Sequence, residues 1–322
     1  MKKRFLCLTL ALLIALLSLF GCASKSTASF KVAVLKGPTG FGAIKLLDDS
    51  KNGSTENTYD FTIESASDAV TSALLSKQLD IAFLPSNAAA MLYNKTEGEV
   101  SVIGVATLGI LYVVSRDENV SSLADLEGKK VVTSGAGSTA EYSTSYLFEN
   151  NGLKIGENVT LDYASEHSEA ASKLLSGEYD IAILHEPFVT MVTLQDNSLK
   201  TAVSLTDEWT KLNAGKLPMA AIAVRTELLK ENSAAIDTFL KEYAASADYV
   251  SKNPAEASEL IEKYDIMKAP AAKNAIPNCN IVCETGEEMK EDLISLYEIL
   301  FDANPKSIGG KMPGDDFYYI AK

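Results

Sequence analysis

The hydrophobic pattern of the chain contains one phrase twice, at positions one hundred residues apart. Residues 74–84 read LLSKQLDIAFL and residues 174–184 read LLSGEYDIAIL, so that seven of the eleven positions are identical. In each copy an amphipathic run ends in an Asp, and the apolar stretch that follows is too short for a helix and typical of a buried parallel strand. Each copy then meets a proline, at Pro85 and at Pro187.

A repeat of this length predicts two similar halves. Solenoid repeats run to roughly 20–50 residues, so the period is too long for that architecture. Two α/β lobes fit it, each with a loop at the carboxyl end of the equivalent strand, which is where open α/β sheets bind ligands. The sequence therefore predicts that the chain binds a ligand between two similar lobes.

Short apolar runs alternate with amphipathic runs along most of the chain, as in successive βα units. Before residue 116 they predict strands at residues 30–35, 60–63, 100–107 and 110–115, a turn at 36–42 with a helix through Leu47, and a helix from Ser67. Between residues 129 and 224 they predict strands at 129–133, 159–163, 181–184 and 219–224, a glycine turn at 134–138, and helices at 139–150 and 168–175.

Beyond residue 225 the pattern becomes helical. Two apolar stripes at helical spacing predict core helices, one with Ile236, Phe239, Leu240, Tyr243, Ala247 and Val250, the other with Met289, Leu293, Leu296 and Leu300. The aromatic run at residues 317–319 follows a loop and either packs back onto the body or forms a rim of the cleft.

The fold class that these elements predict is α/β with two lobes and a double-crossover hinge. The strand that ends near Thr107 leaves the first lobe through Leu108 and Gly109, and the strand at residues 219–224 marks the return. We therefore expect residues 30–108 and 225–322 to form one lobe and residues 109–224 to form the other.

The N-terminus carries a secretion signal. Three basic residues at positions 2–4 precede an apolar run at residues 5–20, which is shorter than the roughly 20 residues of a membrane-spanning helix. The run ends in Leu-Phe-Gly-Cys, the pattern of a bacterial lipoprotein signal, in which Cys22 receives a diacylglycerol. We expect residues 1–21 to be removed and residues 22–29 to form a tether; the alternative is an ordinary signal peptide with an incidental Cys.

Charge narrows the range of partners. The signal takes three of the 29 basic residues and none of the 43 acidic ones, so its removal shifts the formal charge from −14 to −17. This balance disfavours nucleic acid and broad attraction to anionic membranes. A small anionic ligand stays possible, because helix ends and hydroxyls set the field inside a cleft.

Two cysteines remain for the folded part, Cys279 and Cys283. If the segment between them is extended, their Cα atoms lie roughly 13 Å apart, which is too far for a disulfide without a bend. Two thiols are the preferred interpretation and a local disulfide is the alternative. A C-x-x-x-C pair alone is poor support for a metal site.

Residues 135–140 (GAGSTA) match the G-x-G-x-x-A pattern between a strand and a helix. An exported chain has little access to nicotinamide cofactors, and no acidic residue follows about 20 positions on, so no dinucleotide or other cofactor is expected. Backbone N–H groups at the helix start, with the hydroxyls of Ser138 and Thr139, instead predict a pocket for an acceptor group.

Few other motifs suggest catalysis. The chain has two histidines and lacks an H-E-x-x-H motif, a G-x-S-x-G elbow and a G-x-x-x-x-G-K-[ST] loop. Glu64, Glu141 and Glu186 fall near the expected cleft, where solvated or capping roles are commoner than catalysis.

Several motifs carry a family resemblance. Residues 128–132 (GKKVV), residues 137–143 (GSTAEYS) and the helix that runs on to Gly152 resemble the second lobe of ABC-transporter substrate-binding proteins of the aliphatic sulfonate, taurine and nitrate type. LDIA at 79–82, YDIA at 179–182 and SLADLEGK at 122–129 are similar to other stretches of that family. The resemblance covers most of residues 30–260 and implies a periplasmic-binding-protein type II fold whose cleft closes on a small molecule.

Carried over position by position, the resemblance implies ligand contacts from both lobes. In the first lobe these are Thr39, Gly40, Ser86, Asn87 and Thr107. In the second lobe they are Gly137, Ser138, Thr139, Glu141, His185 and Glu186. Taurine-type members tend to carry His at the position of Glu141, so an acid there favours a ligand with an amine or a cationic ring over a sulfonate.

The resemblance implies an extracytoplasmic solute-binding lipoprotein of an ABC importer, which delivers a small polar molecule to membrane permease subunits. We expect a monomer that is anchored by lipid to the cell membrane. One alternative is an enzyme on the same fold, similar to a pyrimidine synthase or a chorismate dehydratase, although the export signal argues against cytoplasmic substrates. A ligand sensor without transport is a further alternative.

Overall fold

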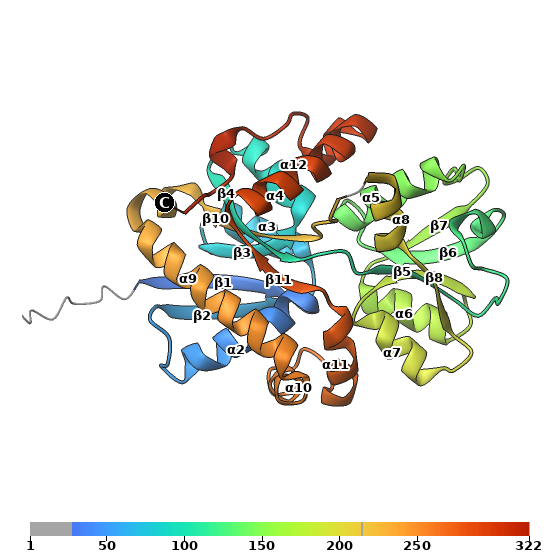
Figure 1. The fold of residues 1–322 in the computed structure, drawn as a ribbon, viewed down its shortest axis with the longest axis horizontal. Helices are drawn as coiled ribbons and strands as arrows, with labels where there is room; N and C mark the ends of the chain where they lie inside the picture. Colours follow the sequence, from blue (N-terminus) through green and yellow to red (C-terminus); the bar gives the residue numbers. More distant parts are fainter. Residues whose placement is uncertain (1–27, 214, 322) are drawn as a thin grey trace, which may run out of the picture.

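The two copies of the repeated phrase contribute equivalent strands to two separate sheets. The computed structural model describes residues 28–213 and 215–321. The expected signal, Cys22 and most of the expected tether therefore lie outside the described residues, and Ser29, placed in the tether by sequence, begins the first strand. Figure 1 shows the lobes side by side, with the second lobe formed by the middle of the chain.

The first lobe contains a six-stranded sheet. Its order is β11 (Ile281–Glu284), β4 (Val100–Thr107), β10 (Ala220–Arg225), β3 (Ile81–Pro85), β1 (Ser29–Leu35) and β2 (Thr58–Glu64). Strand β1 runs parallel to β2 and β3, whereas β10 runs antiparallel to both β3 and β4.

The second lobe contains a five-stranded sheet with a matching centre. Its order is β7 (Thr160–Ala164), β6 (Lys130–Ser134), β8 (Ile181–His185), β5 (Leu111–Ser115) and β9 (Lys200–Ser204). Ile181 pairs with Val131 of the parallel strand β6, as Ile81 pairs with Val32 of β1. An antiparallel strand lies on the other side of each repeat strand, β5 in this lobe and β10 in the first.

The chain passes from the first sheet to the second between β4 and β5 and returns before β10. Sequence placed residues 219–224 at the end of the second lobe, up to a boundary at residue 224, whereas β10 lies inside the first sheet. An apolar strand next to a hinge is buried in either sheet, so its hydrophobic pattern does not indicate which sheet takes it up. The other proposed boundary, after residue 108, stays a prediction.

Helices cover both faces of each sheet (Figure 1). Those of the first lobe are α2 (Pro38–Lys51), α3 (Ser67–Leu75), α4 (Ser86–Lys95), α9 (Thr226–Lys252), α10 (Pro254–Lys263), α11 (Ala269–Ala275) and α12 (Gly286–Ala303). Those of the second lobe are α5 (Thr139–Asn150), α6 (His167–Leu175), α7 (Phe188–Gln195) and α8 (Leu205–Asn213). Short 3-10 segments lie at Leu123–Leu126, Ile276–Asn278, Pro305–Ile308 and Asp315–Phe317.

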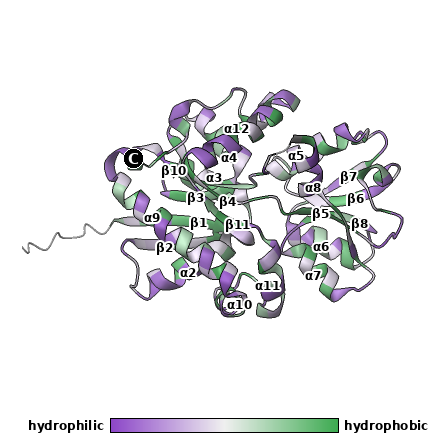
Figure 2. Cartoon of the chain, in the orientation of Figure 1, coloured by the Kyte–Doolittle hydropathy of each residue, from purple (hydrophilic) through white to green (hydrophobic). Residues whose placement is uncertain are grey.

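Successive side chains of β1 point to opposite faces of the sheet, so the core of the first lobe has one part on each face. Val32 and Val34 pack with the stripe of α9 and with α2, whereas Ala33 packs on the opposite face with α3, α4 and α12. Both apolar stripes expected after residue 225 are buried, in α9 and in α12. Figure 2 shows apolar strands at the centre of each lobe and polar residues on the outer sides of the helices.

Three local expectations have clear outcomes. The turn after β1 is shorter than expected, because Pro38 starts α2 directly, and proline is well suited to the first position of a helix. Both cysteines are free thiols, and burial raises the pKa of Cys283 to about 12. The C-terminal aromatics pack back onto the body, where Phe317 lies 5.0 Å from the ring of Tyr93.

Helices α4, α7, α8, α10 and α11 and strand β9 have no counterpart in the sequence expectations. Four of these six elements contain fewer than ten residues and the other two contain ten, and such short elements carry little periodic signal. Among the residues that the structure describes, no helix combines the length and the hydropathy needed to cross a bilayer.

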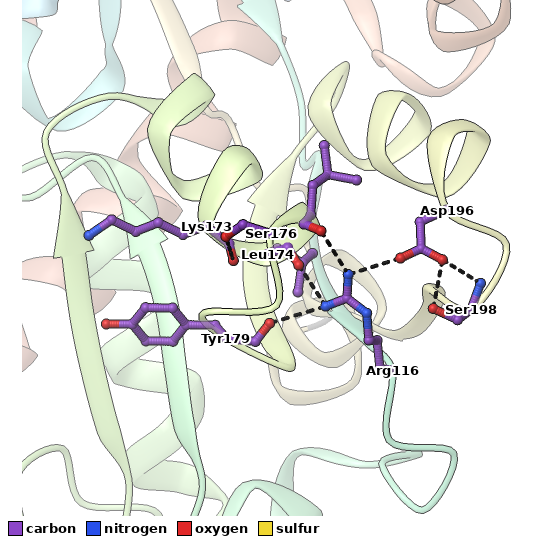
Figure 3. Close-up of polar contacts among 8 residues, drawn as sticks. Arg116, Lys173, Leu174, Ser176, Tyr179, Asp196 and Ser198 are labelled. Carbon is purple, nitrogen blue, oxygen red and sulfur yellow. Dashed lines mark hydrogen bonds and ion pairs between the residues drawn. The ribbon is translucent and has the colours of Figure 1, made fainter.

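Arg116, just after β5, fixes the C-terminal end of α6 (Figure 3). Its guanidinium donates to the carbonyl oxygens of Leu174 at 2.6 Å and Leu175 at 3.3 Å, and it pairs with Asp196 at 2.9 Å. The Leu174 carbonyl also accepts the N–H of Gly177 at 3.2 Å, and a cation beside the last carbonyls of a helix is favourable. The anchored helix begins at His167, which faces the space between the lobes.

Candidate functional site

A cavity of about 140 Å³ lies between the lobes, where the parallel strands of both sheets end. From the first lobe it is lined by Leu35, Lys36, Pro38, Thr39, Ser65, Ser67, Pro85, Thr107, Met219 and Ala220. From the second lobe it is lined by Ile110, Gly135, Ala136, Ser138, Thr139, Ala140, His167 and His185. We call this space the central cavity.

Five of the eleven ligand-binding residues expected from sequence line the central cavity. They are Thr39, Thr107, Ser138, Thr139 and His185. The other six are not among its lining residues, namely Gly40, Ser86, Asn87, Gly137, Glu141 and Glu186. All six nevertheless lie on the same strand ends and helix starts, because they are close in sequence to lining residues.

Four helices begin at the wall of the central cavity. Pro38 and Thr39 open α2, Ser67 opens α3, Thr139 opens α5 and His167 opens α6. The first N–H groups of a helix have no intrahelical acceptor, and the helix dipole adds partial positive charge at this end. Two helices from each lobe therefore favour negative charge in the cavity.

Side-chain charge in the cavity has the same sign. Lys36 is the one lysine, arginine, aspartate or glutamate among the lining residues, and within the described part of the chain its ammonium has no ion-pair partner. The carboxylate of Glu141 accepts the N–H of Gly137 instead of facing the cavity. Glu186 is 2% exposed and accepts from Thr190, through N–H at 3.1 Å and through the hydroxyl at 2.9 Å. Neither carboxylate is therefore placed to bind an amine or a cationic ring of a ligand, as the sequence had suggested.

Thr107, a lining residue of the cavity, has an unused hydroxyl. The residue is 1% exposed, and its Oγ1 has no hydrogen-bond partner among the described residues. The lining hydroxyls of Ser138 and Thr39 are engaged within the protein, because Ser138 donates to Gly135 O at 2.5 Å and Thr39 Oγ1 pairs with the backbone of Leu35. A buried hydroxyl without a partner costs about 1–3 kcal/mol, so a polar ligand atom beside Thr107 would be stabilising.

Two histidines form one side of the cavity. The rings of His167 and His185 meet edge to face, with centroids 3.7 Å apart, and His167 Nδ1 contacts Ser134 Oγ. His185 Nδ1 contacts the carbonyl oxygen of Glu186, and because a carbonyl only accepts, this nitrogen carries the proton. Burial lowers the pKa of His185 to about 4, so the ring is neutral and its Nε2 is an acceptor. Burial, together with His185, also lowers the pKa of His167.

Asn87 joins the lobes instead of lining the cavity. Its N–H donates to Thr139 Oγ1 and the Thr139 hydroxyl donates to Asn87 Oδ1, both at 3.1 Å. Its Nδ2 donates to Gly137 O at 2.9 Å and to Ser307 O at 3.1 Å. These bonds connect the start of α4 to the start of α5, so the lobes are in direct contact beside the central cavity.

The two expected glycines have structural roles. A Cβ on Gly40 would meet Leu35 O at 2.7 Å, so glycine allows α2 to approach β1 closely. Gly137 has a φ of 75°, a conformation that glycine adopts at little cost, and its carbonyl accepts the bond from Asn87. Ser86 is buried, its Oγ has no partner among residues 28–213 and 215–321, and its carbonyl accepts from Tyr297.

Sequence reasoning missed Lys36, Ser65 and His167, although the signal was present. Lys36 and Ser65 directly follow β1 and β2, and His167 begins the helix after β7. The rule that ligands bind beyond the carboxyl ends of strands was applied to the repeat strands and to the glycine turn, but not to the residue that directly follows β1 or to the ends of the edge strands β2 and β7.

One group of carboxylates could suit a cation. Glu284, Glu288 and Asp292 bring their oxygens within 4.8 Å of one another. The Lys216 ammonium already lies among them, at 2.6, 2.5 and 3.3 Å. This lysine precedes β10 in the crossing segment, so the cluster ties that segment to the first lobe.

Comparisons with known proteins agree with this architecture. An ABC transporter protein from Parabacteroides distasonis has a TM-score of 0.77 and 23% identity, over 92% of this chain and 100% of that chain. The aliphatic sulphonate binding protein SsuA from Escherichia coli has a TM-score of 0.73 and 15% identity, over 92% and 94%. The nitrate-binding protein NrtA from Synechocystis PCC 6803 has a TM-score of 0.60 and 13% identity, over 79% and 70%. These likenesses confirm the expected two-lobed fold.

The family itself is shown by a sequence comparison. A comparison with curated proteins found no match. The family model described as "ABC transporter, phosphonate, periplasmic substrate-binding protein" matches residues 54–275, which is more than half of the chain. The chain therefore belongs to this family of ABC-transporter substrate-binding proteins, whose members capture a solute and are not enzymes.

Proposed function

We propose that the chain captures a small organic oxyanion, of the phosphonate or sulfonate type, in the central cavity and presents it to the permease of an ABC importer. The observation that carries this proposal is the convergence of four helix N-termini and Lys36 on a cavity that no carboxylate lines. An oxyanion is the ligand that such a field stabilises. The names of the matched family and of the sulphonate-binding relative point the same way.

The proposed contacts differ from those expected at first. Thr107 donates its free hydroxyl to an oxyanion oxygen, and Lys36 balances the charge. Thr39, Ser138 and Thr139 contribute through the backbone, because their hydroxyls are engaged within the protein. The acceptor at His185 suits the P–OH of a phosphonate monoanion, which a sulfonate lacks.

A thermal-shift comparison of four compounds with four carbons each tests the charge and the class of the ligand. Butylphosphonate and butanesulfonate should raise the melting temperature, the phosphonate more, whereas butylamine and butyramide should not. A ligand at a thousand times its Kd stabilises the folded state by about 4 kcal/mol, which shifts the melting temperature by several degrees. A shift with butylamine and none with either oxyanion would contradict the proposal.

We further propose that the mature protein is a monomer that a lipid on Cys22 anchors to the outer side of the cell membrane. The Leu-Phe-Gly-Cys sequence at residues 19–22 and the small polar residues after it support the anchor. Cys22→Ala should release the protein from membranes or leave its signal uncut, as membrane fractionation and mass spectrometry would reveal. An unmodified mature N-terminus downstream of Cys22 in the wild type would exclude the lipid anchor.

A further inference from the structure

A second hollow, of about 420 Å³, adjoins the central cavity. The two spaces share Lys36, Ser65 and His167 as lining residues, so they lie next to each other. Small-molecule sites typically measure roughly 300–1,000 Å³, and the central cavity alone falls below that range. We call the second space the side hollow.

Apolar side chains from both lobes face the side hollow. Ile266 and Met267, between α10 and α11, line it from the first lobe, and Phe188 and Met191 of α7 line it from the second. All four side chains are partly exposed, whereas large apolar side chains are usually buried. Methionine and aromatic side chains adapt to apolar groups of varied shape, so the hollow suits a hydrocarbon.

The charge around the side hollow suits the substituent of an anion. Lys36 lines both the hollow and the central cavity, and Lys268, which also lines the hollow, lies 3.1 Å from Glu262. Glu166 is the one carboxylate that lines the hollow, and it is exposed. The anionic head would therefore stay with Lys36 and the helix starts, while an uncharged substituent extends past His167.

A third hollow, on another side of the central cavity, supplies a matched control. It measures about 470 Å³, shares Ser67, Pro85, Ala136 and Ser138 with the central cavity, and includes Met91 and Asp68. There the lobes are joined by the bond from Asn87 to Gly137 O, and the lining charges, Asp68 and Lys95, are of opposite sign, so this hollow offers an anion no net attraction. Met91 is 39% exposed, so it can be changed with little effect on folding.

We propose that the side hollow is a subsite for an apolar alkyl or aryl substituent of the bound anion, so that the physiological ligand is an amphiphilic organic oxyanion instead of an inorganic or one-carbon oxyanion. The subsite rests on the function proposed above, which supplies the anionic head. Because the hollow is lined from both lobes, the substituent also touches both of them and adds to the closure around the head.

Calorimetric titration of the protein with methyl-, butyl- and hexylphosphonate tests this subsite. Each methylene that leaves water adds up to about fourfold in affinity, so hexylphosphonate should bind at least tenfold more tightly than methylphosphonate. Met267→Gln and Met191→Gln keep the side-chain length but add a polar amide. Each of these two variants should remove most of the affinity that hexylphosphonate gains over methylphosphonate, and should leave the affinity for methylphosphonate unchanged. The control variant Met91→Gln should change neither affinity.

Three results would overturn the subsite. If the three phosphonates bind with equal affinity, the head site stands and the substituent has no subsite. If Met91→Gln removes the gain and the other two variants do not, the substituent occupies the third hollow. Failure of all three phosphonates to bind would reject the proposed function and the subsite with it. The melting temperature of each unliganded variant reports whether folding is intact.

Discussion

Replacing Ala140 by Asp should weaken the binding of butylphosphonate by at least about 100-fold. Ala140 lines the central cavity in the first turn of α5, so the new carboxylate would enter the region that favours an anion. Two unit charges about 5 Å apart repel by about 3 kcal/mol at an effective dielectric constant of about 20, which corresponds to about 200-fold in affinity. An acidic residue near a helix N-terminus is favourable, so the fold should be retained.

The near-isosteric Ala140→Asn separates charge from size. It should weaken butylphosphonate binding much less than Ala140→Asp does, because it adds the same bulk without the charge. Calorimetry on both variants, with melting temperatures as the control for folding, measures the difference. Equal losses in the two variants would mean that bulk alone blocks the site, and unchanged affinity in both would place the ligand elsewhere.

Acid should destabilise the protein as the pH falls from about 6.5 to about 4. The pKa of His185 is lowered to about 4 in the folded state by burial, against an ordinary value of 6.5. In this window the unfolded chain binds a proton that the folded chain does not, so the free energy of unfolding falls with falling pH. The full difference is about 3 kcal/mol for His185, and His167, whose pKa is also lowered by burial, acts in the same direction.

Urea unfolding at pH 7.5, 5.5 and 4.0 measures this loss, and His185→Asn isolates the contribution of one ring. The variant should be less sensitive to acid than the wild type across the window. Burial raises the pKa of Glu186, so protonation of this carboxyl opposes the loss of stability as the pH falls. The same carboxyl is present in wild type and variant, so it does not affect the comparison between them. Parallel pH profiles for wild type and variant would show that His185 is not the group that takes up the proton.

The repeated phrase predicted the centre of both sheets because burial leaves a strong mark on sequence. Ile81 and Ile181 take equivalent places, each paired with a parallel strand that starts a βα unit. The helix expected at residues 139–150 has the same bounds in the structure, since a glycine turn, an N-cap serine and a terminal Asn-Gly mark both of its ends.

The candidate site was only partly predictable, because strand ends fix where a residue lies but not where its side chain points. Ser138 caps the first turn of α5 and Glu141 lies in that turn, yet the carboxylate of Glu141 accepts from Gly137 N–H, and of the two only Ser138 lines the cavity. Asn87 could not be recognised as a bond between lobes, since its partners are about 50 positions away in sequence. A family resemblance likewise indicates which positions lie at the site, but not where their side chains point.

A crystal structure of the protein with butylphosphonate tests the central claim most directly. The phosphonate group should lie between the lobes, with one oxygen within about 2.6–3.2 Å of Thr107 Oγ1 and others facing the first N–H groups of the helices that begin at the cavity. Its butyl group should extend past His167 toward Phe188 and Met267. A phosphonate bound outside the central cavity, or one held by neither Thr107 nor any of the four helix N-termini, would contradict the account.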